Sequence, residues 1–392
     1  MYDWLIVGGG IHGVLLAHWL LSLEKTTPER LCILDPHDGP LDCWRKRTAS
    51  VGMTHLRSPF VHHLEVDPFF LRKFVKSNPG LVREPFAPPY DRPNLKLFDS
   101  TCQNLIENSK LPDLWRKGEA LSIFKEEAGY LILTESGELR SKQVVLAPGA
   151  GSRLDYPGWV EAEHIDSGRV IHIFDEGFDR TKISEGERVL VLGGGISAVQ
   201  LACSLSKGCR EKIRLYSRHA IRRHEFDSDP CWMGPKCMRK FERVHSYRER
   251  RKMITRARNR GSISSEADFH FRQALRQGSV SHKVREVERV ALTPSGRVDV
   301  AFKEQKPEET FDRIILATGF EQVRPGGELV DGIIDRLSLP VADCGFPILR
   351  EDLSWHQGLF VMGGLAELTL GPSARNIIGA RKAAERILSI SR

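Results

Sequence analysis

One local pattern occurs twice in this chain, and it restricts the possible folds more than any other feature of the sequence. In the first copy, the strand-like run DWLIV (3–7) leads into the glycine turn GGGIHG (8–13) and then into an apolar helix. In the second copy, RVLVL (188–192) leads into GGGISA (193–198) and again into an apolar helix. This order is typical of a β-α-β unit, so the sequence predicts two such units.

The two copies continue to match after the helix. A second strand follows at RLCILD (30–35) in the first copy and at KIRLYSR (212–218) in the second. Each copy also has a later buried strand that ends in a glycine motif, LAPG (146–149) or LATG (316–319). Strands and helices that alternate in this way form a mostly parallel sheet. We therefore predict an α/β protein with two Rossmann-like dinucleotide-binding domains.

The first glycine turn has the pattern that dinucleotide binding requires. Gly8 allows a tight turn, Gly10 lets a pyrophosphate approach the backbone, and Gly13 lets the helix approach the strand. Asp35 ends the second strand, where a carboxylate can bind both ribose hydroxyls. The free N–H groups at the helix start would face the phosphates. The predicted contacts of this site are Gly8, Gly10, Ile11, His12, Gly13 and Asp35.

The second glycine turn differs at the position that selects the nucleotide. Its second strand ends at Arg218 rather than at an acid, and Arg222 and Arg223 follow. A guanidinium attracts the 2′-phosphate of NADP, so these residues favour NADPH over NADH; alternatively, they begin a solvated basic face. The predicted contacts of this site are Gly193, Gly195, Ser197, Ala198 and Arg218.

Composition excludes several other classes of protein. The chain has 392 residues, of which 41% are hydrophobic and 28% charged, as in ordinary globular proteins. No stretch reaches the roughly 18 uncharged apolar residues of a membrane span, and the N-terminus enters a strand without a leader, so we expect a cytoplasmic protein. The eight cysteines form no CxxC pair, and we expect free, mostly buried thiols and no metal site. Cys231 and Cys237 stand six residues apart.

Positive charge is concentrated in one segment. Residues 236–260 hold eleven lysines and arginines against two acids, Glu242 and Glu249, and the segment is expected to be partly helical. This pattern is typical of a solvated helical face, but it would also suit an anionic cofactor, an acidic substrate or a polyanion. No aromatic stripe or RNA-binding motif accompanies it, so nucleic acid is not an expected partner.

On these motifs the chain resembles flavoproteins with two dinucleotide-binding domains. The resemblance covers nearly the whole chain and is looser at about 219–283. It implies FAD in the first site and the nicotinamide cofactor in the second. It also implies a discontinuous FAD domain, residues 1–165 and 312–392, into which the NAD(P) domain, residues 166–311, is inserted. The basic helical segment at about 219–283 would extend the second domain.

The C-terminal residues fit the same plan. A final strand is expected at GLFVMGG (358–364), and a last helix at 373–390 with Ser373 as its N-cap. In the family, this helix directs its N-terminus at the flavin ring, where its dipole favours the anionic reduced flavin. The family's usual Asp is replaced here, because Gly363-Gly364 stands in its place.

Further motifs resemble the class B, N-hydroxylating flavin monooxygenases. They are the stretch from Trp44 to Met53, the run LRSPFVHHL (56–64), the run RRHEFDSDPCWMGP (222–235) and the hinge-like LATGF (316–320). Gly168-x-x-x-His172 matches another class B motif, although Asp166 and Glu176 replace its usual aromatic residues. The further cofactor contacts implied are Trp44, Met53, Arg57, Gly149, Thr318, Gly319, Gly364 and Ser373. Arg57 would hold the FAD phosphate or, alternatively, a substrate carboxylate.

The resemblance implies an activity. NADPH would reduce FAD, the reduced flavin would trap O2 as a C4a-hydroperoxide, and the nitrogen of a small amine or amino acid would be hydroxylated. No catalytic side chain is expected, because the flavin carries the chemistry. The alternative is an NAD(P)H-dependent reductase or oxidase that transfers no oxygen to a substrate. A third possibility is a redox-sensing flavoprotein whose basic face docks an acidic partner. The substrate and the oligomeric state stay open.

Overall fold

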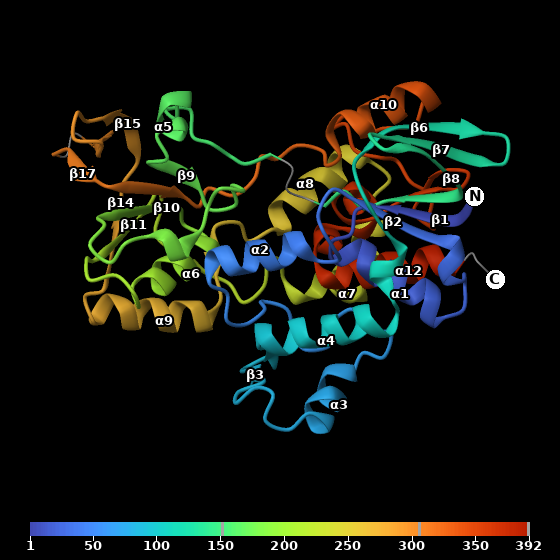
Figure 1. Cartoon of the computed structure of the whole chain (residues 1–392), viewed down its shortest axis with the longest axis horizontal. Coiled ribbons are helices and arrows are strands. Elements are labelled where there is room, and N and C mark those ends of the chain that lie inside the picture. Colours follow the sequence, from blue (N-terminus) through green and yellow to red (C-terminus); the bar gives the residue numbers. More distant parts are fainter. Residues whose placement is uncertain (150–152, 305–306, 390–392) are drawn as a thin grey trace.

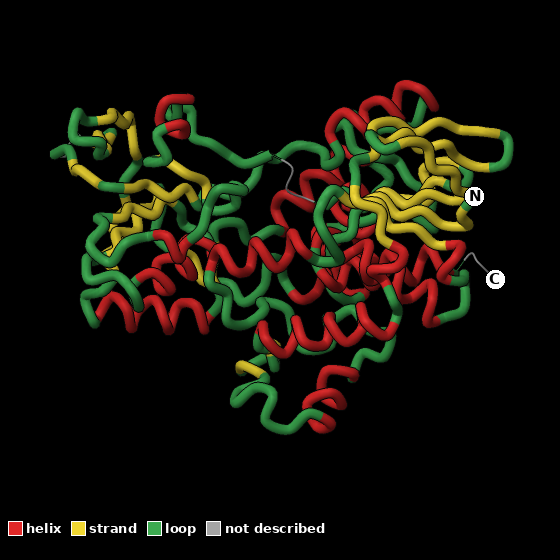
Figure 2. Tube along the Cα trace, viewed as in Figure 1, coloured by secondary structure: helices red, strands yellow, loops and turns green. Residues whose placement is uncertain are grey.

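The computed structural model describes residues 1–149, 153–304 and 307–389. Its strands form two main groups at opposite ends of the molecule, with helices between them (Figure 1, Figure 2). The N-terminal and C-terminal residues both belong to one group, and the middle of the chain forms the other. The predicted α/β fold class is confirmed.

The first sheet has eight strands, in the order β19-β20-β8-β1-β2-β5, and β7 and β6 extend it from β8. β1 pairs in parallel with β2 and β8, and β20 pairs in parallel with β8. The strands are β1 (Tyr2–Val7), β2 (Leu31–Asp35), β5 (Trp115–Lys117), β6 (Ala120–Glu126), β7 (Gly129–Thr134), β8 (Gly137–Leu146), β19 (Ser354–His356) and β20 (Leu359–Val361).

Helices from both ends of the chain pack on this sheet. Helix α1 (Ile11–Ser22) follows the first glycine turn and contacts α12 (Ile377–Leu388). Both helices and the sheet share one apolar core, because α1 is buried along most of its length. The other helices on this side of the molecule are α2 (Asp42–Val51), α3 (Phe70–Ser77), α4 (Leu95–Asn108) and α10 (Gly327–Leu337). Short elements join them: β3 (Phe86–Ala87), β4 (Arg92–Pro93) and the 3-10 helices η1 (Pro28–Arg30) and η2 (Leu111–Leu114).

The second sheet is wholly parallel, in the order β14-β11-β10-β18-β9. Its strands are β9 (Val170–His172), β10 (Val189–Leu192), β11 (Ile213–Ser217), β14 (Val280–Val284) and β18 (Arg313–Leu316). Helices α6 (Ile196–Leu205) and α9 (Ser265–Arg276) share an apolar core with one face of this sheet. A three-stranded sheet packs on the other face and consists of β15 (Val287–Leu292), β16 (Val298–Phe302) and β17 (Glu309–Phe311). The remaining elements here are α5 (Ala162–Asp166) and η3 (Arg180–Lys182).

The basic segment is partly helical, as predicted. It forms α7 (Pro235–Glu242) and α8 (Tyr247–Ala257), and it is flanked by β12 (Arg222–Arg223), η4 (Pro230–Trp232) and β13 (Ser262–Ile263). These helices do not stand apart from the protein. Helix α8 contacts α11 (Glu367–Leu370) and η6 (Pro372–Arg375), which follow η5 (Gly363–Ala366). Both α7 and α8 share the small apolar core around Leu368.

Three expectations about local structure were wrong. The last helix begins at Ile377, and Asn376 is its N-cap residue. Ser373 therefore lies within η6 and is not the N-cap. Ile390, the expected end of the helix, is outside the described residues. The final strand covers only Leu359–Val361 because the chain then turns into η5. The second strand of the second unit ends at Ser217 rather than at Arg218.

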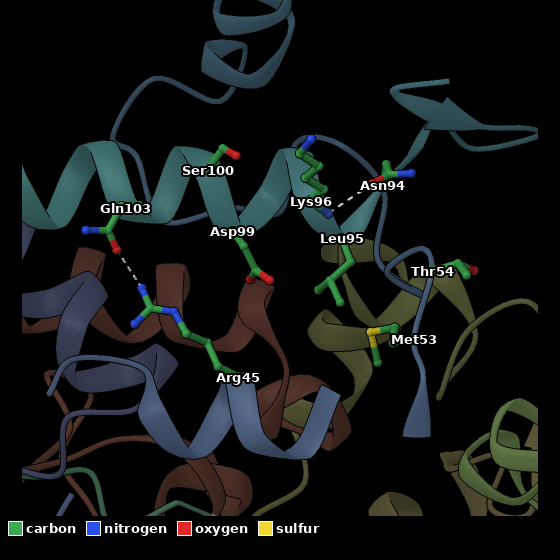
Figure 3. A pocket seen from close by; sticks show the side chains of 9 residues that line it. All are labelled: Arg45, Met53, Thr54, Asn94, Leu95, Lys96, Asp99, Ser100 and Gln103. Carbon is green, nitrogen blue, oxygen red and sulfur yellow. Dashed lines mark hydrogen bonds between the residues drawn. The ribbon is translucent and has the colours of Figure 1, made fainter. Parts of the chain in front are cut away.

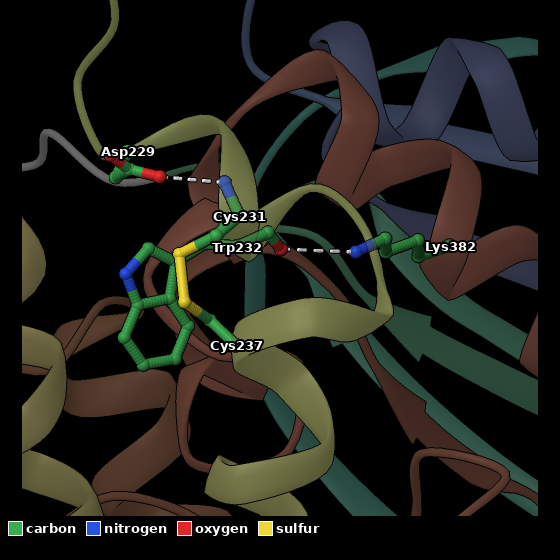
Figure 4. Close-up of a disulfide and its surroundings, with 5 residues drawn as sticks. All are labelled: Asp229, Cys231, Trp232, Cys237 and Lys382. Carbon is green, nitrogen blue, oxygen red and sulfur yellow. Dashed lines mark hydrogen bonds between the residues drawn. A yellow bond between two sulfur atoms is a disulfide. The ribbon is translucent and has the colours of Figure 1, made fainter.

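The cysteines also differ from the prediction. Cys231 and Cys237 form a disulfide at the start of α7, beside Trp232 and Lys382 (Figure 4). The Nζ atom of Lys382 donates to the carbonyl oxygen of Trp232 at 3.3 Å, which ties this segment to α12. Six cysteines are free, and only Cys32 and Cys102 of these are fully buried. None of the described helices is both long enough and apolar enough to span a bilayer.

Candidate dinucleotide-binding sites

The first glycine turn can be built only from glycine at two of its positions. Gly8 has φ of +110°, and a Cβ there would lie 2.2 Å from the carbonyl oxygen of Ala147. A Cβ on Gly13 would lie 1.8 Å from the carbonyl oxygen of Gly8. Both contacts are far shorter than van der Waals distance, so these glycines let β1, β8 and α1 approach one another.

Gly10 has a different role. A Cβ at Gly10 would meet no heavy atom within 4 Å, so the fold itself does not require glycine there. Gly10 is the N-cap of α1 and supplies no side chain to the helix start. The first N–H groups of the helix, from Ile11, His12 and Gly13, therefore face open space without intrahelical partners. This arrangement at a helix N-terminus has the shape and the polarity that a pyrophosphate requires.

Asp35 is held rigidly beside the turn. Its Oδ2 atom accepts a hydrogen bond of 2.6 Å from the backbone N–H of Gly9, and Oδ1 accepts one of 2.9 Å from the backbone N–H of His37. The Trp115 ring packs directly against Gly9, so closely that a Cβ on Gly9 would lie 2.1 Å from the ring. The indole N–H of Trp115 donates to the carbonyl oxygen of His37. The sequence did not point to Trp115 or His37; their place follows from the pairing of β5 with β2.

The C-terminal segment closes the first site. The Nε2 atom of His12 lies 3.0 Å from the carbonyl oxygen of Ala374 in η6. Burial lowers the pKa of His12 to about 4, so the ring is neutral at pH 7 and donates this hydrogen bond from Nε2. The neighbouring Ser373 is fully buried, and its hydroxyl has no partner among the described residues. An unpaired hydroxyl at this position fits a polar cofactor atom in the same cavity.

Four further predicted residues line the connections between the sheets. Gly149 follows β8 with φ of +78°, and Gly319 follows β18 with φ of +89°; each has open space at its Cβ position. The hydroxyl of Thr318 donates to the carbonyl oxygen of Asp155 at 2.5 Å. A Cβ on Gly364 would lie 2.8 Å from the ring of Pro325, so glycine is required there.

The second glycine turn repeats the first. Gly193 has φ of +157°, and a Cβ there would lie 2.4 Å from the carbonyl oxygen of Ala317, just as Gly8 meets Ala147. Gly195 is the N-cap of α6, and a Cβ there would meet only the Cα atom of Gly261, at 3.7 Å. Ser197 and Ala198 lie in the first turn of α6. The second turn therefore also offers a helix N-terminus and space for a phosphate.

The two sites differ at the ribose position. In the first sheet Val7 pairs with Leu34, the residue before Asp35. In the second sheet the equivalent Leu192 pairs with Tyr216, the residue before Ser217. Ser217 therefore occupies the position that Asp35 has in the first site. The hydroxyl of Ser217 donates to the carbonyl oxygen of His219 at 2.6 Å, and no acid replaces the missing carboxylate.

The side chains around Ser217 belong to residues that follow β11 in the chain. The His219 ring packs between Gly194 and Gly261. Arg218, Arg222 and Arg223 are all exposed.

Trp44, Met53 and Arg57, from the two monooxygenase-like motifs at 44–53 and 56–64, have different surroundings in the structure. Trp44 packs on Phe98, and its N–H donates to Asp99 at 3.1 Å. Met53 lines a cavity of about 670 Å³ between α2 and α4 (Figure 3). Arg57 donates to the carbonyl oxygens of residues 224–226. Its guanidinium is thus engaged by the protein, and its role at an FAD phosphate or a substrate carboxylate stays a prediction.

The two halves of the molecule meet around a half-buried carboxylate. Glu266 of α9 lies 3.3 Å from Arg92, which is 1% exposed, and 2.9 Å from His55. His55 and Arg92 hold the pKa of Glu266 below its usual value although burial opposes this. Glu266 also lines a cavity of about 520 Å³ between the 52–57 segment and the helices α6 and α9.

Three further histidines, His62, His63 and His172, are buried. His172 accepts from the backbone N–H of Phe174 through Nδ1, and its Nε2 has no partner among the described residues. Burial lowers the pKa values of His62, His63 and His172 to about 4, so all three are neutral. Within the described ranges, no three histidine, cysteine or acidic side chains gather as metal ligands would.

The first β-α-β unit lies in a part of the chain that matches a known protein family. Residues 5–151 match the sequence model of a family described as FAD-NAD(P)-binding. An uncharacterized oxidoreductase of Bacillus velezensis is 24% identical over 53% of this chain and 52% of its own length. A ferredoxin–NADP reductase of Metallosphaera sedula is 32% identical over 32% of this chain and 38% of its own length. The chain thus spans about half or less of the length of these relatives.

Solved structures share the whole fold. The FAD-bound cadaverine monooxygenase of Erwinia amylovora superimposes with a TM-score of 0.74 at 17% identity, covering 100% of this chain and 94% of its own. The ornithine hydroxylase of Pseudomonas aeruginosa gives a TM-score of 0.74 at 17% identity, covering 100% of this chain and 98% of its own. The predicted flavoprotein fold is confirmed, and the family match supports the predicted FAD and NAD(P) binding.

Proposed function

We propose that this chain is an NADPH- and FAD-dependent monooxygenase that hydroxylates a nitrogen atom of a small amine or amino acid. The observation that carries the proposal is the presence of two complete glycine turns in one chain, one beside an acid at Asp35 and one beside Ser217 and exposed arginines. Two dinucleotide sites of different nucleotide preference suit two cofactors that exchange electrons. The fold shared with two amine- or amino-acid-hydroxylating flavoproteins supports the oxygen chemistry.

FAD would occupy the first site. The helix start at Gly10 would hold its pyrophosphate, and Asp35 would accept hydrogen bonds from the adenosine ribose. Bound FAD would supply hydride acceptance and oxygen activation. The His12–Ala374 hydrogen bond holds η6 against the glycine turn, so Ser373 and the backbone around it can complete the cavity.

NADPH would occupy the second site. Gly195 and the start of α6 would hold its pyrophosphate, and the absence of an acid at Ser217 leaves room for a 2′-phosphate. Arg218 is exposed beside this position and can approach the phosphate. The residues of the basic segment that pass over Gly195, including Gly261, would shield this site from water.

Product analysis tests the proposed activity. The purified flavin-loaded protein is incubated with NADPH and oxygen and with a panel of diamines and amino acids. NADPH consumption, hydrogen peroxide and hydroxylamine products are then quantified together. We expect at least one amine to give a hydroxylamine in near-equal amount to the NADPH consumed. Quantitative peroxide formation with every amine would instead identify a reductase or oxidase, the alternative function.

A further inference from the structure

Part of the basic segment faces inward, toward one buried carboxylate. Glu367 of α11 is 1% exposed and accepts hydrogen bonds from Arg375 at 2.8 and 3.0 Å. Arg251 of α8 donates to the same carboxylate at 2.6 Å, and Arg258 lies 3.9 Å from it. Three guanidinium groups from two distant parts of the chain therefore surround one acid.

The charges around Glu367 do not balance. Arg260 lies two residues after Arg258, and its guanidinium donates to the side-chain oxygen of Gln322 rather than to a carboxylate. The acids in this group are Glu367 and Asp227, which pairs with Arg258 at 3.0 Å. Four guanidinium groups against two carboxylates leave an excess of two positive charges. Concentrating unpaired charge in a partly buried site is costly unless an anion compensates it.

Unused hydrogen-bond donors accompany this excess. The Nε and Nη2 atoms of Arg251 and the Nε atom of Arg258 have no partner among the described residues, although they are buried. Arg251 stacks on the ring of Phe346 at 3.8 Å, which fixes the plane of its guanidinium. The hydroxyl of the buried Ser228, whose backbone pairs with that of Arg258, is also unpartnered.

The group is also open to solvent on one side. Arg260 is exposed, and the side chain of Arg251 is 22% exposed. Arg375 follows Ala374, the partner of His12, so the group borders the first glycine turn. The pyrophosphates already have sites at the starts of α1 and α6, so they do not account for this charge.

We propose that Arg251, Arg258, Arg260 and Arg375 form an anion-binding site for a doubly negative group, either a phosphate or a pair of carboxylates. The group would be carried by the substrate or by the nicotinamide dinucleotide. This inference goes beyond the proposed activity, because the site is defined by its charge and not by any reaction. Planar guanidinium groups bind such oxyanions through paired hydrogen bonds.

Calorimetric titration of the flavin-loaded protein with inorganic phosphate at low salt tests the proposal. Replacing Arg251 with glutamine should weaken phosphate binding about tenfold or more. Arg248→Gln is the matched control, because Arg248 is exposed on the same helix, and it should change binding less than about twofold. Equal effects of the two substitutions, or no measurable phosphate binding by the unmodified protein, would overturn the proposal.

A second variant separates binding from structural damage. Glu367→Gln removes one of the two compensating carboxylates, so phosphate should bind more tightly even if the variant is less stable. A purely structural role for the arginines predicts the opposite, because loss of Glu367 would loosen the group and weaken binding. Weaker phosphate binding by a folded Glu367→Gln protein would therefore contradict an anion site.

Titration with NADP⁺ and NAD⁺ distinguishes the two sources of the anion. If Arg251→Gln weakens NADP⁺ binding but not NAD⁺ binding, the 2′-phosphate binds at this group instead of beside Ser217 and Arg218, and its placement under the proposed function is overturned while the anion site stands. If neither dinucleotide is affected while phosphate binding falls, the anion belongs to the substrate. Both results support the site. None of these readouts depends on turnover, so failure of the proposed monooxygenase activity would leave the test intact.

Discussion

The imidazole of His12 donates to the carbonyl oxygen of Ala374, 362 positions later in the chain, over 3.0 Å. The contact joins the first glycine turn to the segment before the last helix. It holds the two ends of the chain together at the first glycine turn. Replacing His12 with alanine should remove the hydrogen bond and cost about 1–2 kcal/mol of unfolding free energy. It should also weaken FAD retention, measured by flavin release during dilution; unchanged retention would contradict a closing role for η6.

Four histidines with lowered pKa values predict a stability that depends on pH. The pKa values of His12, His62, His63 and His172 are lowered from 6.5 to about 4 in the folded protein, chiefly by burial. Between pH 6.5 and 4 the unfolded chain therefore binds more protons than the folded one. Stability is fully present above pH 6.5 and falls as the pH falls toward 4. Each ring should contribute about 2 kcal/mol of this loss between pH 7 and pH 5.

Urea unfolding at the two pH values measures the effect. His62→Gln should reduce the difference between pH 7 and pH 5, because one proton-binding group of the unfolded chain is removed. His245→Gln is the control, since His245 is exposed and should leave the difference unchanged. Equal pH dependence in His62→Gln and the unmodified protein would show that burial of this ring does not determine its protonation.

The two glycines of the first turn should respond differently to substitution. Gly8→Ala places a Cβ 2.2 Å from the Ala147 carbonyl oxygen at a positive φ, so the protein should unfold or lose several kcal/mol of stability. The Cβ atom of Gly10→Val would meet no heavy atom within 4 Å, so the fold should persist while FAD is lost. Circular dichroism and flavin content separate the outcomes. Full flavin content in Gly10→Val would exclude the first turn as the pyrophosphate site.

The pair formed by Glu266 and Arg92 should stabilise the contact between the two halves. Glu266→Gln leaves the buried Arg92 without its charged partner, and we expect a loss of about 3 kcal/mol in unfolding free energy. The control is Glu185→Gln, which breaks an ion pair whose side chains are 86% and 63% exposed, and it should cost less than about 1 kcal/mol. Similar losses in the two variants would show that burial of Arg92 is unimportant.

The ribose position of the second site predicts a change of cofactor preference. Ser217→Asp restores the acid that the first site has at Asp35, so it should repel a 2′-phosphate and accept hydrogen bonds from NADH. We expect the ratio of kcat/KM for NADPH to that for NADH to fall at least about tenfold, or roughly 1.4 kcal/mol. Arg218→Gln should weaken NADPH alone. An unchanged ratio in both variants would place nucleotide selection elsewhere.

Much of the fold follows from local patterns. The strand and glycine turn at 3–13 and its repeat at 188–198 identify both β-α-β units, because glycine is the only residue that tolerates the close contact of Gly8 with Ala147 and of Gly193 with Ala317. The side chains that complete each site come from distant segments. Trp115 reaches Gly9, and His219 and Gly261 reach the second turn, only after the sheets have formed.

The position of the basic segment could be predicted from the sequence, but the contacts of its arginines could not. Its charge was visible, but helical periodicity does not show which arginines face a buried acid, since Glu367 lies more than a hundred positions away from Arg251. For the same reason Arg57 could not be placed; its partners at residues 224–226 belong to a segment without a recognisable pattern. The Cys231–Cys237 disulfide likewise depends on the turn between η4 and α7.

Two cofactors bound to one chain should exchange a hydride, and anaerobic mixing of the flavin-loaded protein with NADPH tests this transfer directly. The flavin absorbance of the unmodified protein should bleach rapidly with NADPH and more slowly with NADH. Gly195→Ala, whose new Cβ would lie an acceptable 3.7 Å from Gly261, should keep its flavin and its fold but be reduced at least about tenfold more slowly. Equal rates of reduction in the two proteins would contradict a nicotinamide site at the second glycine turn.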